Sequence, residues 1–495
     1  MGILSKVEPK SVFKYFEEIS SIPRPSYQEK AISDHLVKFA KDRDLEVHQD
    51  SIYNVIIIKE ASEGYEDVPP IVIQGHMDMV CEKVAGCSKD METEGLDLVL
   101  DGDTLSAKGT TLGGDDGIAV AYAMALLDDK ELKHPRLEVV ITVSEEVGMD
   151  GARDIDLSML KGRRLLNLDS EGEGSILASC AGGGRSDIVL PLKRERVRGD
   201  IRMLLSVTGL KGGHSGDEID KGRANATILL NRVLATLRRE ADMRIVALEG
   251  GSKDNAIPRE SHALISVPKK MADKVAEMIP ALSDSIHAEY HIADPDIRLT
   301  CELITDAKKA IELDLPEEAV GWHPLTKRES HRVITLISAL PNGIQRMSDA
   351  IPGLVETSLN LGVCYMTQKE LGLGYSLRSS VGAAYSWLHD QVELVASGLG
   401  ADVSFHGEYP AWEFVDKSDF RDRICEIYKD MFGEELKVEA IHAGLECGLL
   451  SAKVPGLDAV SMGPNIWDIH TPDEHLSIAS VERTWRFVRA IIEDK

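Results

Sequence analysis

The chain has 495 residues, 43% of them hydrophobic, so it is long enough for several domains of about 150 residues and can bury full cores. Its 83 acidic and 56 basic side chains give a formal net charge of −27, and a surface of that sign repels phosphate backbones and anionic membranes. Composition therefore excludes fibrous, disordered and disulfide-scaffold proteins, and argues against nucleic-acid and membrane partners.

The first third of the sequence alternates helical and strand patterns. β-branched and apolar runs predict buried strands, and apolar residues at helical spacing predict the helices between them. In chain order these elements are helices at 9–20 and 26–42, strands at 54–60 and 70–78, a helix at 116–129, and strands at 137–146 and 163–171. This alternation is typical of an α/β sheet with helices on its faces.

The pattern changes near residue 186 and returns near residue 385. Strand-like stretches at 201–210, 263–268, 297–305 and 355–366 enclose amphipathic helices at 223–240 and 270–289. Beyond them come helices at 383–397, 417–431 and 477–493, with strands at 402–406 and 457–462. We therefore predict an α/β domain with a mixed sheet over 1–185 and 385–495, interrupted by an α+β domain over 186–384.

Acidic and imidazole side chains stand at the ends of these strands, where ligands collect in an open α/β sheet. They are His76 and Asp78, Asp115 before the helix at 116–129, Glu145 and Glu146, Asp169, and His470 in the loop after 457–462. Each one alone is more often a solvated acid, a helix cap or a structural histidine. Their recurrence in five segments makes one shared site the stronger hypothesis.

The residue types in these segments suit a dinuclear metal site. Imidazoles and carboxylates without thiolates suit Zn²⁺, Mn²⁺ or Co²⁺, and a carboxylate can bridge two cations. On an extended strand His76 and Asp78 project to the same side, so one can ligate while the other orients it. The neighbours Glu145 and Glu146 point differently, which permits one on a metal and one on a bound water. Such a site is hydrolytic.

Several motifs make this hypothesis more specific. GHMDMV, GTTLGGDDGIAVA, SEEVGMDGA, NLDSEGEG, GGHSG and IHTPDEH, in this order, resemble the dinuclear metallopeptidases that include carnosinases, peptidase T, aminoacylases and glutamate carboxypeptidases. GLKGGHSGDEIDKGRANA, HAGLECGLL and SMGPNIWDIHTPDEHLSI resemble in particular the bacterial aminoacyl-histidine dipeptidase (Xaa-His dipeptidase, peptidase D) branch. The resemblance runs from the first predicted helix to the last.

The resemblance implies two divalent ions per chain, Zn²⁺ with Mn²⁺ or Co²⁺ as alternatives. In that scheme His76 and Asp169 hold one ion, Glu146 and His470 hold the other, and Asp115 bridges them. A cis peptide is expected between Asp115 and Asp116. Relatives of this branch often carry Asn at the position of Asp116.

The resemblance also implies the remaining catalytic roles. Asp78 orients His76, and Glu145 is the general base for a hydroxide that bridges the ions. In the inserted domain His214 polarises the scissile carbonyl. The substrate ends are bound by Asn255 and Arg378 at the carboxylate and by Glu446 at the ammonium.

The expected reaction is hydrolysis of unblocked dipeptides, with Xaa-His preferred on resemblance alone. Two rivals stay open: a related amide hydrolase such as an aminotripeptidase or deacylase, and a non-catalytic metal-binding protein. Glu145 argues against the second rival, because a structural site needs no free base. We further expect a homodimer formed through the inserted domain, which acts as a lid.

The cysteines and the N-terminus predict a cytoplasmic protein. Seven cysteines are scattered without a C-x-x-C pair, which is typical of free thiols in a reducing compartment. The N-terminal segment lacks the basic and apolar regions of a signal peptide. No apolar run approaches the roughly 18 residues that a membrane helix needs.

Overall fold

The computed structural model describes residues 2–304 and 317–495 and divides the chain into two compact units. Unit 1 comprises Met1–Cys180, Trp412–Ala440 and Leu445–Lys495, and unit 2 comprises Ala181–Ala411 and Ile441–Gly444. Unit 1 is a mixed α/β structure and unit 2 is an α+β insertion, so the predicted fold class is confirmed.

The boundary after the insertion lies later than the predicted residue 385. Helix α9 (Gly382–Gly398) packs against β18 (Glu370–Ser379), and strand β19 (Asp402–Tyr409) pairs antiparallel with β9 (Gly182–Pro191). All of these elements therefore belong to unit 2. A helix followed by a strand fits either unit, so the pattern alone could not show which sheet this strand joins.

A sheet of eight strands, counted over the described residues, forms the centre of unit 1 in the order β1-β2-β6-β3-β7-β21-β8-β20. The strands span Glu46–Gln49 (β1), Val55–Lys59 (β2), Ile71–His76 (β3), Leu137–Thr142 (β6), Arg164–Asn167 (β7), Ser175–Cys180 (β8), Lys437–Ile441 (β20) and Asp458–Ser461 (β21). Strand β3 runs parallel to β6 and β7, and β7 runs parallel to β21. The carboxyl ends of these four strands therefore meet at one edge of the sheet.

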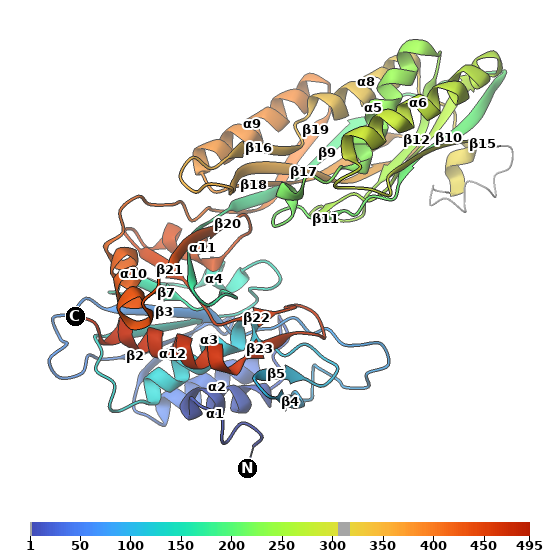
Figure 1. The fold of residues 1–495 in the computed structure, drawn as a ribbon. Helices are drawn as coiled ribbons and strands as arrows, with labels where there is room; N and C mark the ends of the chain where they lie inside the picture. Colours follow the sequence, from blue (N-terminus) through green and yellow to red (C-terminus); the bar gives the residue numbers. More distant parts are fainter. Residues whose placement is uncertain (1, 305–316) are drawn as a thin grey trace. The chain divides into compact units, whose positions relative to one another are not determined.

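Helices cover this sheet. They are α1 (Lys10–Ser20), α2 (Lys30–Lys41), α3 (Gly114–Asp128), α4 (Asp150–Asp154), α10 (Asp419–Phe432), α11 (Glu446–Lys453) and α12 (Ile478–Glu493) (Figure 1). Almost every residue of α3 is buried, because its Ala, Val and Leu side chains pack against both α1 and β3. In the same core Tyr122 of α3 stacks on Trp485 of α12. The helix that begins at the candidate site is thus fixed on all sides.

A smaller sheet in unit 1, in the order β22-β23-β5-β4, carries the segment around His470. Its strands are Leu98–Asp101 (β4), Thr104–Ala107 (β5), Ile466–Trp467 (β22) and His475–Ser477 (β23). Because β22 and β23 pair antiparallel, the residues between them form a hairpin loop. That loop contains His470.

Unit 2 is built on an antiparallel sheet of nine described strands in the order β15-β10-β14-β12-β17-β18-β9-β19, with β16 paired to β17. The strands not yet given are Asp200–Thr208 (β10), Arg244–Gly250 (β12), Ser261–Pro268 (β14), Arg298–Ile304 (β15), Gly343–Met347 (β16) and Val355–Met366 (β17). A separate pair joins Gly213–His214 (β11) to Ala256–Ile257 (β13). Strands β12 and β17 meet only at Gly250 and Cys364 among the described pairs.

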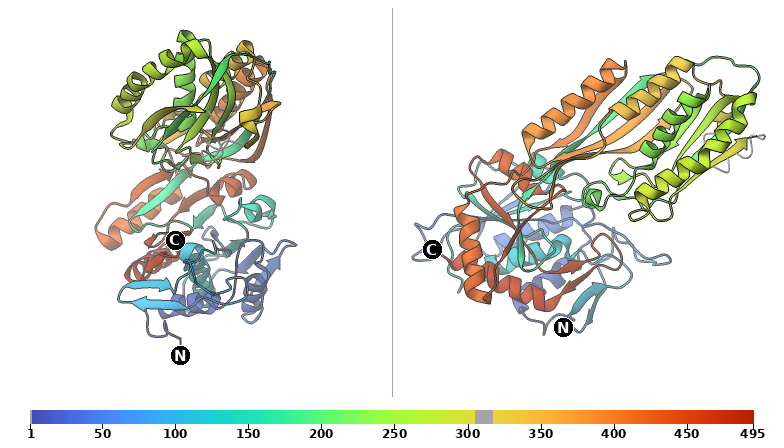
Figure 2. Two further views of the ribbon diagram at one scale, coloured as in Figure 1. Left: turned by 90° about the vertical axis from the view of Figure 1, so that its right-hand side faces the viewer. Right: turned by 45° about the horizontal axis from the view of Figure 1, so that its top comes forward.

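Helices α5 (Ala226–Glu240), α6 (Ala272–Tyr290), α8 (Lys327–Ala339) and α9 lie in a row on one face of this sheet (Figure 2). Their apolar sides and the facing strand residues form one core. Short 3-10 turns lie at Ile219–Lys221, Lys269–Met271 and Glu317–Gly321.

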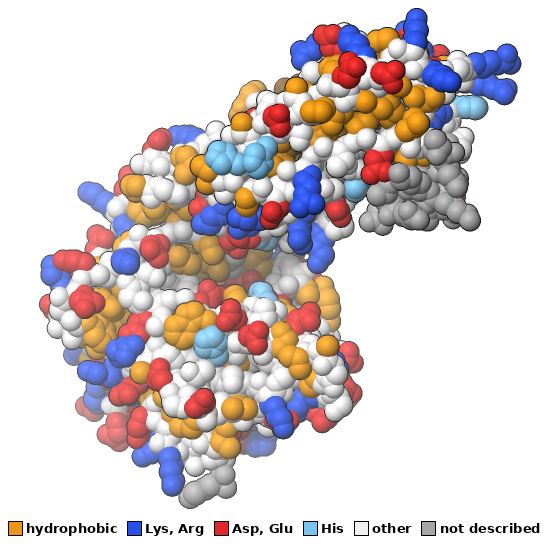
Figure 3. All heavy atoms as spheres, turned by 45° about the vertical axis from the view of Figure 1, so that its right-hand side comes forward, with side chains coloured by type: hydrophobic (Ala, Val, Ile, Leu, Met, Phe, Trp, Pro, Cys, Tyr) orange, Lys and Arg blue, Asp and Glu red, His pale blue; other side chains and the backbone are white. Residues whose placement is uncertain are grey.

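The surface carries both signs of charge. Figure 3 shows acidic and basic side chains interspersed over the face that it draws. Among the described helices, none combines the length and the apolar composition needed to cross a bilayer.

Candidate metal centre

The predicted ligands of unit 1 meet where the parallel strands end. His76 is the last residue of β3, Glu145 and Glu146 follow β6, and Asp169 follows β7. Asp115 lies at the start of α3, after a glycine turn. Because β3, β6 and β7 are parallel neighbours, their strand ends bring these side chains together at one edge of the sheet.

Asp115 lies between two imidazoles. Its Oδ1 is 3.1 Å from Nε2 of His76, and its Oδ2 is 3.1 Å from Nε2 of His470. The same Nε2 of His76 is 3.6 Å from Oδ1 of Asp169, and Nε2 of His470 is 2.9 Å from Oε2 of Glu146. Each imidazole nitrogen therefore faces Asp115 and one further carboxylate, an arrangement that suits two cations sharing one carboxylate.

Asp78 connects the imidazole of His76 with the backbone of the glutamate pair. Its Oδ1 is 3.3 Å from Nδ1 of His76 and accepts the backbone N–H of Glu145 at 3.1 Å. Its Oδ2 accepts the hydroxyl of Ser26 at 2.8 Å and the backbone N–H of Glu146 at 3.4 Å. Burial alone would raise the pKa of Asp78, but these bonds and the nearby His76 hold it below its usual value. Asp78 therefore stays ionised and orients the imidazole.

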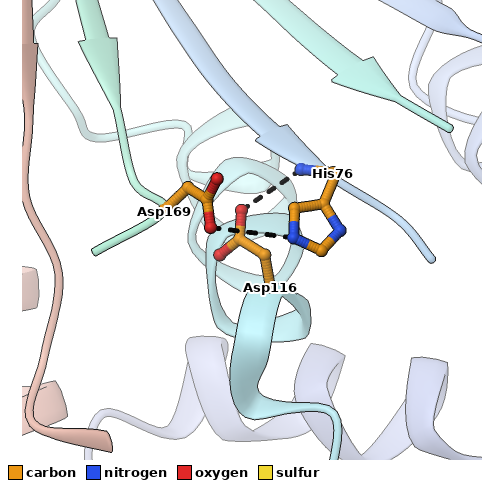
Figure 4. Close-up of side chains that lie close together, drawn as sticks. All are labelled: His76, Asp116 and Asp169. Carbon is orange, nitrogen blue, oxygen red and sulfur yellow. Dashed lines mark hydrogen bonds and ion pairs between the residues drawn. The ribbon is translucent and has the colours of Figure 1, made fainter. Parts of the chain in front are cut away.

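Asp116 contacts His76 from a different side. Its Oδ2 accepts the backbone N–H of His76 at 3.1 Å. Figure 4 shows the carboxylate of Asp116 beside the carboxylate of Asp169 and the ring of His76. The peptide between Asp115 and Asp116 is cis, as expected. Burial and the neighbouring carboxylate of Asp169 raise the pKa of Asp116 well above its usual value.

The electrostatics of this cluster favour added positive charge. Burial works to lower the pKa of His76, but Asp169, Asp115 and Asp78 raise it well above its usual value. Hydrogen bonds to Asp115 and Glu146 raise the pKa of His470 to about 11. Protons on the imidazoles thus neutralise part of the acidic cluster, and bound cations would serve the same purpose.

The residues present fit divalent metal ions. The sets His76 with Glu145 and Glu146, and Asp115 with Glu146 and His470, each offer ligand atoms within 4.8 Å of one another. Oε1 of Glu146 is buried and has no hydrogen-bond partner among the described residues. Two imidazoles and several carboxylates, without thiolates, match the donor preferences of Zn²⁺, Mn²⁺ and Co²⁺.

Three predicted residues of unit 2 form a separate cluster around Gly216. A Cβ at Gly216 would lie 2.8 Å from the backbone oxygen of His442, too close for any other residue without a shift, and 3.1 Å from Cε1 of His214 and 3.2 Å from Cζ of Arg378. The backbone oxygen of Asn255 accepts the N–H of Ser215 at 2.8 Å, which places Asn255 beside the same turn. Nδ1 of His214 is 3.1 Å from Oδ2 of Asp217, and Nη1 of Arg378 donates to the hydroxyl of Tyr409.

Glu446, predicted to bind the substrate ammonium, is fully buried. It lies at the start of α11, and its Oε2 accepts hydrogen bonds from Gln74 of β3 and Thr142 of β6. Burial raises the pKa of Glu446 to about 8. Its Oε1 has no partner among the described residues and is the atom left to meet a ligand.

Sequence reasoning missed two residues that hold the site from behind. Arg24, 1% exposed, donates to the backbone oxygens of Met77 and Asp78 at 3.0 Å. Glu474, 2% exposed, accepts backbone N–H groups of the turn before Asp115. Glu474 lies inside the IHTPDEH motif, but a second acid four residues after His470 carries no signal of its backbone partners.

Three comparisons relate the chain to known proteins. The model of the family described as peptidase family M20/M25/M40 matches residues 72–494. The chain is 35% identical over 495 residues to the protein of Escherichia coli (strain K12) named cytosol non-specific dipeptidase, covering 100% of this chain and 99% of the relative.

Two solved structures are also similar. The aminoacylhistidine dipeptidase from Vibrio alginolyticus matches with a TM-score of 0.90 and 36% identity, over 99% of this chain and 98% of that one. The aminopeptidase PepT from Bacillus cereus matches with a TM-score of 0.55 and 16% identity over 98% of each chain, a likeness of fold alone.

Proposed function

Because the chain belongs to peptidase family M20/M25/M40, we propose that it is a dipeptidase that cleaves unblocked dipeptides and favours histidine at the second position. Membership makes it a hydrolase of peptide bonds and confirms the resemblance seen in its motifs. The names of the Escherichia coli and Vibrio relatives support the dipeptide substrate. The observation that carries the reaction is the Asp115 carboxylate between the imidazoles of His76 and His470.

We assign the metal ligands as the geometry suggests. His76 and Asp169 would hold one divalent ion, Glu146 and His470 the other, and Asp115 both. Zn²⁺ is the first candidate, with Mn²⁺ and Co²⁺ as alternatives. When bound, such ions polarise the scissile carbonyl and lower the pKa of the attacking water.

The chain's own residues supply the proton transfers and the binding of substrate. Glu145 takes a proton from the attacking water and passes it to the leaving amine. His214 donates a hydrogen bond to the oxygen on which negative charge develops. Arg378, with Asn255, binds the substrate carboxylate through paired N–H groups, and Glu446 binds the ammonium.

An aminotripeptidase or a deacylase would use the same metal residues, so the metal centre does not separate these activities from a dipeptidase. Only the groups that bind the two ends of the substrate can distinguish a dipeptidase from an aminotripeptidase or a deacylase. Glu145 argues against a non-catalytic metal-binding role, because a structural metal site needs no free base beside it.

Removal of metal should abolish dipeptide hydrolysis, and addition of Zn²⁺, Mn²⁺ or Co²⁺ should restore it. Elemental analysis should find two divalent ions per chain, because two imidazoles and three carboxylates can serve two ions with Asp115 shared. Asp115→Asn should hold fewer than two ions, since an amide cannot bridge as a carboxylate does. Full activity after complete metal removal would refute the proposed site.

We expect a homodimer formed through unit 2. Among the described strands, β15 and β19 lie at the two ends of the sheet order, and an edge strand can pair with a second copy. If His214 serves the neighbouring subunit, an equal mixture of Glu145→Gln and His214→Ala proteins should regain about a quarter of wild-type activity, since half of the dimers are mixed and each has one intact site. Sedimentation and activity measured on the same samples test this. A fully active monomer at high dilution would exclude the shared site.

We also propose a cytoplasmic location. All seven cysteines are free in the structure, and Cys180, Cys364 and Cys447 are buried. Free thiols persist in a reducing compartment.

A further inference from the structure

The turn that delivers Asp115 to the metal centre is held by one buried carboxylate. Glu474 accepts the backbone N–H groups of four consecutive residues: Leu112 at 2.8 Å, Gly113 at 2.9 Å, Gly114 at 2.8 Å and Asp115 at 3.3 Å. Both of its oxygens are used, Oε2 for the first two and Oε1 for the last two. Four backbone donors on the two oxygens of one buried side chain fix the conformation of this turn.

A buried cation holds the same turn. Nη2 of Arg24 donates to the backbone oxygen of Gly113, while Nη1 donates to the oxygens of Met77 and Asp78 beside His76. A Cβ at Gly113 or at Gly117 would lie 2.5 Å from Nη2 of Arg24, which explains glycine at both positions. Through these hydrogen bonds Arg24 links the strand end at His76 to the turn that Glu474 holds.

Glu474 also belongs to the loop of His470. The two residues lie four apart between β22 and β23, and the backbone N–H of Glu474 donates to the oxygen of Thr471. One carboxylate thus joins the hairpin that carries His470 to the turn that carries Asp115, although the two segments are more than 350 residues apart in sequence.

We propose that Glu474 is a positioning residue for the metal centre, which sets the carboxylate of Asp115 against the imidazole of His470. This inference rests on the proposed function, because it assumes that Asp115 and His470 share an ion. Groups that orient metal ligands in this way typically contribute about 10–100-fold to metal affinity or activity. The competing explanation is that Glu474 only stabilises the N-terminus of α3, where an acid is favourable in any protein.

Glu474→Gln tests the proposal, and Glu138→Gln is its matched control. Glu138 is fully buried in the same unit and accepts the backbone N–H groups of Lys161 at 3.0 Å and Gly162 at 2.9 Å. It lies near the start of β6, at the opposite end of that strand from Glu145. The same substitution at both positions removes buried bonds to a backbone turn, but only Glu474 contacts the turn of a metal ligand.

The experiment titrates each metal-free full-length protein with Co²⁺ and records affinity, stoichiometry and the visible absorption spectrum. We expect both variants to unfold at lower temperature in the presence of chelator. Only Glu474→Gln should bind the second Co²⁺ about 10–100-fold more weakly and change the cobalt spectrum. Its kcat should fall while KM stays within about threefold of wild type, because uniform substrate binding is untouched.

Two results would overturn the proposal. One is a Glu474→Gln protein with wild-type affinity for both ions, and the other is an equal loss of affinity in Glu138→Gln. If Glu474→Gln does not fold, Glu474→Asp keeps the charge but shortens the reach, and the same readouts apply to it. Failure of the proposed function is distinct, because wild type would then bind Co²⁺ without cleaving dipeptides, and the comparison of the variants' affinities would still decide the role of Glu474.

Discussion

Glu145→Gln should lower kcat for dipeptide hydrolysis by at least about 10²–10⁴-fold, the usual contribution of a general base. Glutamine keeps the shape of the side chain but cannot take a proton from water. The backbone N–H of residue 145 would still donate to Asp78, so the loop should keep its conformation. Burial raises the pKa of Glu145 well above its usual value, which suits a group that must bind and release a proton. Steady-state kinetics beside elemental analysis provide the measurement.

The neighbouring residue is the control for this experiment. Oε2 of Glu146 lies 2.9 Å from Nε2 of His470, so Glu146→Gln should lose metal as well as activity. Glu145→Gln should retain both ions and KM close to wild type. If Glu145→Gln also loses an ion, then Glu145 is a ligand, and the assignment of the two neighbours must be reversed.

The position of the site could be predicted because it depends on short-range signals. Apolar runs mark the buried strands β3, β6 and β7, and polar residues at their ends must lie on one edge if those strands are parallel. The residues that orient the ligands gave no such signal. Arg24 and Glu474 act through backbone groups of segments distant in sequence, and only the folded chain brings these together.

The domain boundary shows a second limit of pattern reading. Helix α9 and strand β19 have the periodicity of an α/β domain, yet β19 completes the antiparallel sheet of unit 2. Edge strands are assigned by their partners, and partner choice is a property of the whole sheet. Residues 305–316, which include the end of the predicted strand at 297–305, lie outside the described part of the chain.

Asp116 shows how the structure accounts for a departure from the family pattern. The resemblance implies that relatives often carry Asn at this position. Here Asp116 is 1% exposed, and burial raises its pKa well above the usual value. Its Oδ2 accepts the backbone N–H of His76 at 3.1 Å, a hydrogen bond that the amide oxygen of Asn could also accept. Asp116 and an Asn at this position can therefore both accept the backbone N–H of His76.

An unblocked dipeptide should be cleaved with kcat/KM at least about 10²-fold above that of a tripeptide or an N-acetyl amino acid, because a buried charge left without its partner costs several kcal/mol. A dipeptide carries a carboxylate and an ammonium on either side of one scissile bond. In the proposed site Arg378 would provide a planar cation for the carboxylate, and Oε1 of Glu446, which has no hydrogen-bond partner among the described residues, would accept a hydrogen bond from the ammonium. An acetyl group removes the ammonium charge. A third residue moves one of the two terminal charges farther from the scissile bond.

Arg378 makes this specificity testable within the chain. Arg378→Ala should raise KM for dipeptides about 10²-fold and remove most of the preference over longer substrates, since the carboxylate then has no cation. Arg239→Ala, at an exposed arginine on α5, should leave both parameters unchanged. The decisive series compares Xaa-His, Xaa-Leu, a tripeptide and an N-acetyl amino acid. A higher kcat/KM for the tripeptide or the acetylated substrate than for the dipeptides would refute the dipeptidase proposal. Equal kcat/KM values for Xaa-His and Xaa-Leu would refute only the histidine preference, which no described side chain explains.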